Sequence, residues 1–234
     1  MNEAQYTQYY VAFLDILGFK NLVNDPNISC QDILDTYKFV GYRHREFFGK
    51  KYKYLRDSIK MKIMSDSICL YIEVDTPNAL FLLIAYCVTF QRDLLVRDPS
   101  VFIRGGITMG EMYVEEDVMY GPALTEAYLL EEKNAKVPRI IIRKSTVDYG
   151  MNQCDTHAQA GITAGIFRDD DAFYAINYFD YLTFRTSQEV INRIKETISD
   201  KLDTTIDESI RQKYLYVDKN LNRYTSEIEE ISNA

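Results

Sequence analysis

The chain has 234 residues, which is enough for one generous domain or for one domain with an appendage. Its formal net charge is −8 and it contains no run of lysines or arginines, so composition argues against nucleic acid or an anionic membrane as a partner. The four cysteines form no CxxC pair, and we find neither an apolar leader nor an apolar stretch long enough to span a bilayer. We therefore expect a soluble, cytoplasmic protein.

The first predicted strand covers residues 8–16, where a continuous apolar run stops before a glycine. A short helical turn follows, and helical spacing of apolar residues then predicts a helix over residues 32–48. Residues 59–63 and 68–72 alternate as two strands. This pattern predicts a hairpin with Asp66 at its tip.

The middle of the chain is predicted to alternate between helix and strand. Pro77 opens a helix that ends near Val96, and residues 101–109 form the next strand. Three glycines in and just after that strand indicate that backbone or ligand must come close to it. A helix over residues 122–136 and a buried strand over residues 138–142 follow.

The sequence after this strand begins with a predicted polar loop. Residues 165–167 and 173–178 are predicted to form an edge hairpin, with Asp169, Asp170 and Asp171 as its solvated tip. From Ser187 onward the chain reads as charged helix with an apolar stripe at Val190, Ile191, Ile194, Ile198 and Leu202. We therefore divide the chain into a main domain, residues 1–183, and a helical extension, residues 184–234, packed on that domain or on a partner chain.

The order β, α, β, β, α, β, α, β fits an α+β fold with a ferredoxin-like sheet and helices packed on a face. The first strand and the hairpin are then neighbours, which brings Asp15 and Asp66 together. A buried, unpaired carboxylate costs several kcal/mol, so two such groups point to a shared metal. Taken alone, Asp15 is better explained as a helix cap or turn carboxylate.

Four blocks of the sequence carry a resemblance: Phe13-Leu-Asp-Ile-Leu-Gly-Phe19, Lys62-Ile-Met-Ser-Asp66, Arg104-Gly-Gly-Ile-Thr-Met-Gly110 and Gly121-Pro-Ala-Leu-Thr-Glu-Ala-Tyr-Leu-Leu-Glu131. In order and spacing they resemble the blocks of class III nucleotidyl cyclases, over residues 8 to 180. Their variants are most similar to the bacterial pyrimidine cyclases of the Pycsar anti-phage systems, and the stretch Lys213-Tyr-Leu-Tyr216 adds to that likeness.

The resemblance implies that the main domain is a cyclase catalytic domain, which closes a nucleoside triphosphate to its 3′,5′-cyclic monophosphate and releases pyrophosphate. Two divalent ions, Mg²⁺ or Mn²⁺, lower the pKa of the ribose 3′-hydroxyl and hold the triphosphate in such a reaction. The family pattern assigns these ions to Asp15 and Asp66, with the Ile16 carbonyl as an added ligand.

The resemblance also implies substrate contacts. The β- and γ-phosphates are assigned to the backbone N–H groups of Leu17, Gly18, Phe19 and Lys20. Arg104 matches the position whose guanidinium contacts the triphosphate, and Lys62 matches the base-selecting lysine of the purine cyclases. Three tyrosines are further candidates for walls of a nucleotide site: Tyr52, Tyr54 and Tyr128.

Two departures from the purine cyclases stand out. Where those enzymes have a substrate-binding Asn and a transition-state Arg, this chain has Thr125 and Leu129. Leucine cannot stabilise charge on a transferring phosphate, so another cation is needed. The candidates are Arg139, Lys133 and Arg168. The position of the base-reading acid is Val118, with Asp117 beside it.

These departures argue against ATP or GTP as the substrate, and together with the Pycsar-like variants of the four blocks they argue for a pyrimidine. Our leading hypothesis is a homodimeric cyclase with sites at the dimer interface, making cyclic UMP in preference to cyclic CMP and signalling phage infection to a separate effector that it does not bind directly. Leu129 favours a second hypothesis, a catalytically silent domain that binds a nucleotide or only dimerises. Lys62 keeps a third hypothesis open, an adenylate cyclase.

Overall fold

The structure is a computed structural model, and it describes residues 4–48 and 58–232. Its strands are β1 (Thr7–Ile16), β2 (Lys60–Met64), β3 (Ser67–Glu73), β4 (Ile103–Val114), β5 (Met119–Tyr120), β6 (Ile140–Ile142), β7 (Ile166–Arg168) and β8 (Tyr174–Ile176). Its helices are α1 (Phe19–Asn24), α2 (Cys30–Phe48), α3 (Ala79–Leu95), α4 (Pro122–Asn134), α5 (Lys144–Asn152), α6 (Thr156–Gly165), α7 (Tyr178–Arg185), α8 (Gln188–Thr204) and α9 (Glu208–Ser232).

The strands form one mixed, mostly antiparallel sheet in the order β2-β3-β1-β4-β6-β8-β7, and β5 pairs with the far end of β4. β1 lies between β3 and β4 and is antiparallel to both, while β4 and β6 are parallel. The predicted hairpin is present, with Ser65 and Asp66 between β2 and β3. The α+β class, the first strand and the hairpin at Asp66 are therefore confirmed.

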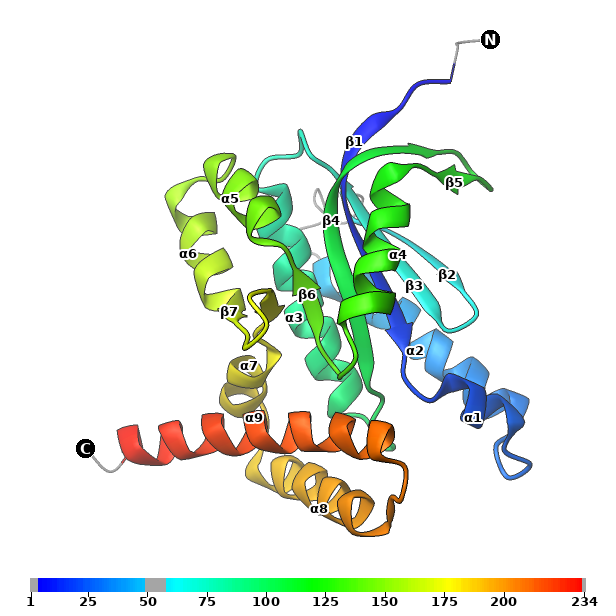
Figure 1. The fold of residues 1–234 in the computed structure, drawn as a ribbon, viewed down its shortest axis with the longest axis vertical. Helices are drawn as coiled ribbons and strands as arrows, with labels where there is room; N and C mark the ends of the chain where they lie inside the picture. The colour runs from blue at the N-terminus through cyan, green and yellow to red at the C-terminus, as the bar shows by residue number, and fades with distance from the viewer. Residues whose placement is uncertain (1–3, 49–57, 233–234) are drawn as a thin grey trace.

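Helices cover both faces of this sheet (Figure 1). Alternate residues of β1 point to opposite faces, so Ala12 and Leu14 pack with α3 in the largest apolar cluster. Val11 belongs instead to the cluster on the other face, which includes Ala123 and Ala127 of α4. The strand is continuously apolar from Tyr9 to Leu14 because both of its faces are largely buried there.

The predicted close approach to the glycines of β4 is also confirmed, and its partner is protein backbone. A Cβ atom on Gly106 would lie 2.7 Å from the carbonyl oxygen of Ala127, and one on Gly105 would lie 2.7 Å from the carbonyl oxygen of Phe13. Gly106 thus lets α4 lie directly against the sheet, whereas Gly110 has only ordinary contact distances.

Part of the region predicted as a polar loop is helical, which corrects the sequence prediction. α5 and α6 occupy most of residues 144–165 and pack against α3. They bury few residues, among them Val147 and Ile162, so the sequence shows too weak an apolar stripe to predict a helix. The N-cap of α6 is the signal that we missed, because Asp155 accepts a hydrogen bond from the Ala158 N–H at 2.9 Å.

The tip of the β7–β8 hairpin also differs from the prediction. Asp169 and Asp171 are not simply solvated, because both pair with the guanidinium of Arg139. Arg139 is buried and needs counter-charges, which these two carboxylates supply. Asp170 alone points to solvent, where its carboxylate lies 3.2 Å from the ammonium of Lys219.

The C-terminal helices pack on one end of the domain. A separate apolar cluster joins Phe179 of α7, Ile194 of α8, and Val217 and Leu221 of α9. The predicted stripe of α8 contributes its buried residues Ile191, Ile194 and Ile198 to this cluster. In Figure 1, α9 crosses the end of the sheet at which β1 finishes and β4 begins. In the described part of the chain, every helix is too short or too polar to cross a bilayer.

Candidate functional site

The site predicted around Asp15 and Asp66 lies at the end of β1. In the register of the sheet, Asp15 faces Ser67 of β3 on one side and Arg104 of β4 on the other. The Ile16 N–H donates a hydrogen bond to the Asp66 carbonyl oxygen at 3.0 Å. The two aspartates are therefore brought to one end of the sheet, as the predicted topology requires.

Asp15 is partly buried and has one close cationic partner. The Arg104 Nε–H donates a hydrogen bond to Asp15 Oδ2 at 2.9 Å. Burial raises the pKa of the Asp15 carboxyl, Arg104 opposes that rise, and the nearby charge of Asp66 adds to it. A cation placed between the two aspartates would relieve both unfavourable effects.

Glu131 is the third carboxylate of this site, and we did not predict it. Its side chain on α4 is buried, with Oε1 2.8 Å from Arg104 Nε. Burial is the main cause that raises the Glu131 pKa to about 7, against the lowering effect of Arg104. The spacing Ala123, Ala127, Glu131 follows one helical face, so the residue could have been found as an acid at a core position.

Arg104 is thus an ion-paired strand residue in this structure. Its guanidinium lies between Asp15 and Glu131, and Nη1 also approaches the Ala135 carbonyl oxygen at 3.4 Å. Its contact with a triphosphate stays a prediction. To make that contact, Arg104 would exchange one of these carboxylates for phosphate oxygens.

The turn after β1 supplies fewer phosphate donors than we predicted. The Leu17 N–H already donates to the Phe102 carbonyl oxygen at 2.9 Å. Gly18 adopts a left-handed conformation with φ 79°, and α1 begins at Phe19. The N–H groups of Gly18, Phe19 and Lys20 lie at the start of this helix, where such groups have no intrahelical acceptor.

Lys62 is engaged elsewhere. Its ammonium donates hydrogen bonds to the carbonyl oxygens of Glu115 and Glu116, at 2.9 and 3.1 Å, in the β4–β5 connection. Val118 and Asp117 lie in this same connection and are exposed. Lys62 therefore holds the connection against β2, and its contact with a base stays a prediction.

The exposed face of α4 carries Thr125, Tyr128 and Leu129. The Thr125 hydroxyl donates to the Gly121 carbonyl oxygen at 3.2 Å, within the first turn of the helix. The Tyr128 ring packs edge-on against Phe13 with centroids 5.5 Å apart. The other tyrosines suggested as walls, Tyr52 and Tyr54, lie outside the described residues.

The three cations considered as replacements for the missing arginine lie in different places. Arg139 is neutralised by Asp169 and Asp171. Arg168 is on β7, at the edge of the sheet farthest from the β2–β3 hairpin. Lys133 is exposed in the last turn of α4. In the strand order of the described chain, β4 separates β1 from β6, which follows Arg139, and β4, β6 and β8 separate β1 from the strand that carries Arg168.

The residues at the end of β1 suit a hard divalent ion that is completed by substrate. No group of three or more His, Cys, Asp or Glu residues within 4–48 and 58–232 is arranged to hold a metal ion. Mg²⁺ is commonly bound by one or two carboxylates together with water and substrate phosphates. Asp15 and Asp66, with the Ile16 carbonyl, fit that pattern better than they fit an all-protein site.

Comparison with known proteins identifies the fold. No family model matches the chain, and no curated protein matches its sequence. The catalytic core of a rhodopsin-guanylyl cyclase with converted specificity, solved in complex with ATPαS, is similar in structure. Its sequence identity is 15%, its TM-score is 0.53, and the match covers 75% of this chain and 98% of that chain.

Two further solved structures match less closely. A bacterial light-regulated adenylyl cyclase has 14% identity and a TM-score of 0.46, covering 84% of this chain and 59% of that one. An adenylate/guanylate cyclase/hydrolase from Silicibacter pomeroyi has 19% identity and a TM-score of 0.45, covering 64% of this chain and 83% of that one. The likeness to the guanylyl cyclase core shows the class III cyclase catalytic domain fold, which confirms the predicted fold class.

Proposed function

We propose that this chain is a metal-dependent nucleotidyl cyclase that converts a nucleoside triphosphate to its 3′,5′-cyclic monophosphate and pyrophosphate. The observation that carries the proposal is the placement of Asp15 beside Asp66, at the end of β1, in a chain with the cyclase catalytic domain fold. Fold alone does not assign an activity, so the proposal depends on these two carboxylates.

In the reaction, the ribose 3′-oxygen forms a bond to the α-phosphorus while the bond from that phosphorus to the bridging oxygen of pyrophosphate breaks. Asp15, Asp66 and the Ile16 carbonyl would hold two Mg²⁺ or Mn²⁺ ions, which supply a lowered hydroxyl pKa and charge neutralisation when bound. The N–H groups of Gly18, Phe19 and Lys20 would orient the terminal phosphates.

Arg104 would bind the triphosphate while remaining attached to the protein through Glu131. Its guanidinium has several N–H donors in a planar fork, so it can contact a carboxylate and a phosphate at once. The structure already places Glu131 2.8 Å from Arg104 Nε. Glu131 would then keep Arg104 oriented when substrate competes for the contact with Asp15.

We further propose a pyrimidine substrate, UTP in preference to CTP, in anti-phage signalling through a separate effector. The support is the set of departures at Thr125 and Leu129 and the resemblance to Pycsar cyclases. The engagement of Lys62 with two backbone carbonyls is consistent with a base site that does not use the purine-selecting lysine. The active form would be a homodimer with its sites at the interface.

Leu129 favours one other function, a catalytically silent domain that binds nucleotide. Its side chain is partly exposed on α4 and is uncharged, so it cannot stabilise the negative charge of a transition state. Such a domain would bind a nucleoside triphosphate and metal and release the nucleotide unchanged.

The test is turnover of UTP, CTP, ATP and GTP by the purified chain with Mn²⁺ or Mg²⁺, with products identified by mass spectrometry. We expect cyclic UMP as the main product. Asp66→Asn should lower turnover by about 100-fold or more, because it removes a charged metal ligand. Asp200→Asn, which removes an exposed carboxylate of α8, is the matched control and should retain activity. No cyclic product from any of the four nucleotides would contradict the enzyme proposal.

A further inference from the structure

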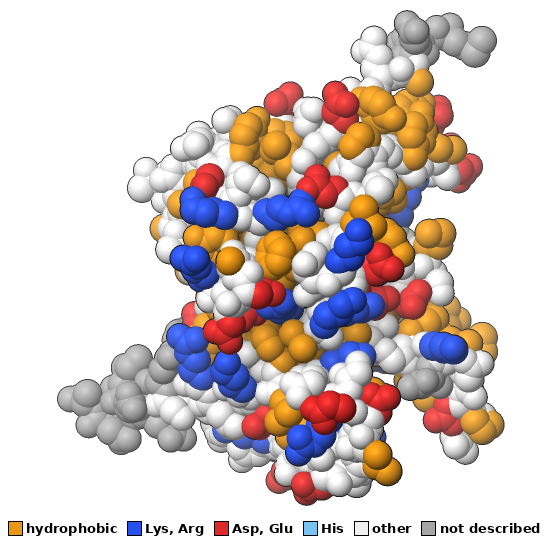
Figure 2. Space-filling model, in the orientation of Figure 1, with side chains coloured by type: hydrophobic (Ala, Val, Ile, Leu, Met, Phe, Trp, Pro, Cys, Tyr) orange, Lys and Arg blue, Asp and Glu red, His pale blue; other side chains and the backbone are white. Residues whose placement is uncertain are grey.

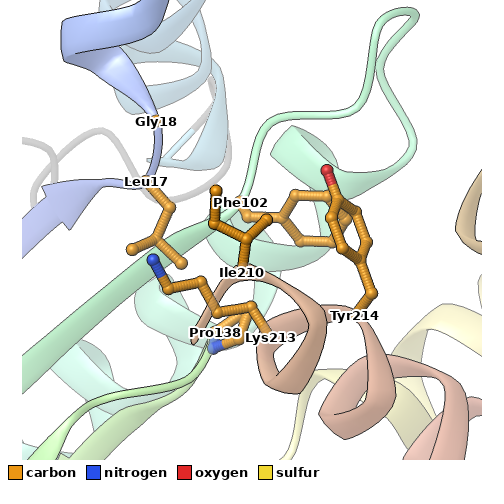
Figure 3. A pocket seen from close by; sticks show the side chains of 7 residues that line it. All are labelled: Leu17, Gly18, Phe102, Pro138, Ile210, Lys213 and Tyr214. Atoms are coloured by element: carbon orange, nitrogen blue, oxygen red, sulfur yellow. The ribbon is translucent and has the colours of Figure 1, made fainter. Parts of the chain in front are cut away.

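The C-terminal helix α9 forms a cavity with the turn that follows β1. The cavity has a volume of about 170 Å³ and is lined by Leu17 and Gly18 of the turn and by Ile210, Lys213 and Tyr214 of α9 (Figure 3). Because one water occupies about 30 Å³ of liquid, this space can hold a group the size of a phosphoryl. Because Leu17 and Gly18 directly follow β1, the cavity adjoins the end of β1 that carries Asp15.

Lys213 is the charged side chain that faces this cavity. Figure 3 shows it extending from α9 toward the turn, with its terminal nitrogen beside the Leu17 side chain. Within the described residues, no carboxylate lies within ion-pair distance of this ammonium, and it makes no hydrogen bond. Arg104, Lys62 and Arg139 differ in this respect, since each is engaged by protein oxygens.

Among the described residues that line this cavity, Lys213 alone carries a charge. The surroundings of the cavity are largely apolar, with Leu17, Phe102 and Ile210 among its walls. An ammonium in such surroundings attracts an anion more strongly than one in open solvent does.

The backbone that carries Lys213 is fixed by the packing of the residues that follow it in α9. The Tyr214 ring lies edge-on to Phe102, just before β4, with centroids 5.6 Å apart. About one turn farther along α9, Tyr216 donates a hydrogen bond to Asp169 at 3.2 Å and Val217 is fully buried. A preorganised cation loses less entropy on binding a ligand than one on a mobile segment.

We propose that the cavity between α9 and the Leu17–Gly18 turn is a phosphate subsite in which Lys213 binds the terminal phosphates of a nucleoside triphosphate. The inference rests on the proposed function for the identity of the whole substrate. The α-phosphate would lie toward Asp15 and Asp66, and the chain of phosphates would run from there to Lys213. The C-terminal extension would then supply a substrate-binding residue to the main domain.

The test compares Lys213→Gln with Lys219→Gln, an equal charge change on the same helix at an exposed lysine that pairs with Asp170. Calorimetric titration with inorganic tripolyphosphate and Mg²⁺ measures the subsite without turnover. We expect Lys213→Gln to weaken binding by roughly 10-fold or more, the size of one lost charge-assisted contact, and Lys219→Gln to stay within about 2-fold of the unmodified chain. Lys213→Arg should restore most of the affinity.

A second variant separates a loss of binding from a loss of folding. Lys213→Met keeps the aliphatic stem against the cavity wall, so its thermal midpoint should match that of Lys219→Gln while its tripolyphosphate affinity falls. Equal affinity of Lys213→Gln and Lys219→Gln would overturn the inference, and so would failure of the unmodified chain to bind tripolyphosphate. Lys213-dependent binding without a cyclic product from any nucleotide would support the subsite and contradict the proposed enzyme.

Discussion

At the scale of single residues, the end of β1 has more carboxylates than positive charges. Asp15 and Glu131 share one guanidinium, so the site holds two carboxylates for one positive charge before Asp66 is counted. The more buried of the two, Glu131, takes up this imbalance through a pKa of about 7. A bound divalent cation would favour the ionised forms of all three.

The first prediction concerns Glu131 and pH. Because its pKa of about 7 in the folded protein lies above the ordinary value of 4.5, the protonated side chain favours the folded state. That contribution is fully present below pH 4.5 and is lost as pH rises through 7. Between pH 5 and pH 8 the free energy of unfolding should therefore fall relative to that of Glu131→Gln, by at most about 3 kcal/mol.

Urea denaturation at pH 5, 6, 7 and 8, without added metal, measures this difference. Glu132→Gln is the control, because Glu132 is exposed and its substitution leaves the burial of Glu131 in place. Its curve should run parallel to that of the unmodified chain. If the free energy of unfolding of Glu131→Gln also changes with pH in parallel with that of the unmodified chain, burial of Glu131 does not cause the pH dependence of stability between pH 5 and pH 8.

At the same residue scale, the sequence predicted which strand residues meet at the candidate site, but it did not predict which helix residues join them. Asp15 and Asp66 could be placed together because a hairpin beside a strand fixes the sheet register over short distances. Glu131 and Lys213 approach the site on helices that pack against it. Their positions depend on how α4 and α9 lie on the domain, which periodicity does not specify.

Among the elements, helix packing on the sheet decides how the site is closed. Gly106 allows α4 to lie against β4, and this contact brings Glu131 to Arg104. The sequence indicated a close approach at this glycine and left open whether backbone or ligand made it. The helices α5 and α6 were not predicted, because they bury few apolar side chains against α3 and so show no clear apolar stripe in the sequence.

The second prediction tests whether α9 is part of the domain. Leu221 is fully buried in the cluster that contains Phe179, so Leu221→Ala should lower the free energy of unfolding by about 2–5 kcal/mol. Ile206, in the α8–α9 connection, is 98% exposed, and Ile206→Ala should change it by less than about 0.5 kcal/mol. Chemical denaturation followed by circular dichroism measures both variants. A cost for Leu221→Ala as small as that for Ile206→Ala would show that the extension does not unfold with the domain.

Across the whole molecule, most of the alternation of strands and helices up to residue 142 was predictable, because those elements have a clear apolar period or a proline or glycine boundary. The short strand β5 was not predicted, since its stretch of sequence was taken as a loop. The packing of the extension on the sheet end that carries the site was not predictable. It depends on an apolar cluster assembled from α7, α8 and α9, of which only the α8 stripe was identified in the sequence.

The exposed surface bears on the proposed dimer. Large hydrophobic side chains are exposed near β5, at Tyr6, Val118 and Tyr120, and Figure 2 shows hydrophobic groups gathered at that end of the molecule. Tyr6 and Tyr120 pack edge-on with centroids 6.0 Å apart, so two of these side chains are in contact. Single exposed apolar residues are ordinary, whereas a gathered set favours a protein partner. A second copy of this chain is the partner that the proposed function requires.

The last prediction follows from that surface. Sedimentation equilibrium should give twice the mass of one chain, and Val118→Glu should weaken dimerisation by roughly 10-fold or more, because the new charge would be buried in the interface. Val118 is 47% exposed, while Tyr149 is 42% exposed on α5, so Tyr149→Glu is a control of similar exposure away from β5. If the sites lie at the interface, turnover per chain should fall with the dimer fraction in Val118→Glu and recover at higher protein concentration. Full turnover by a chain that sediments as a monomer would contradict interface sites, because each domain would then hold a complete site of its own.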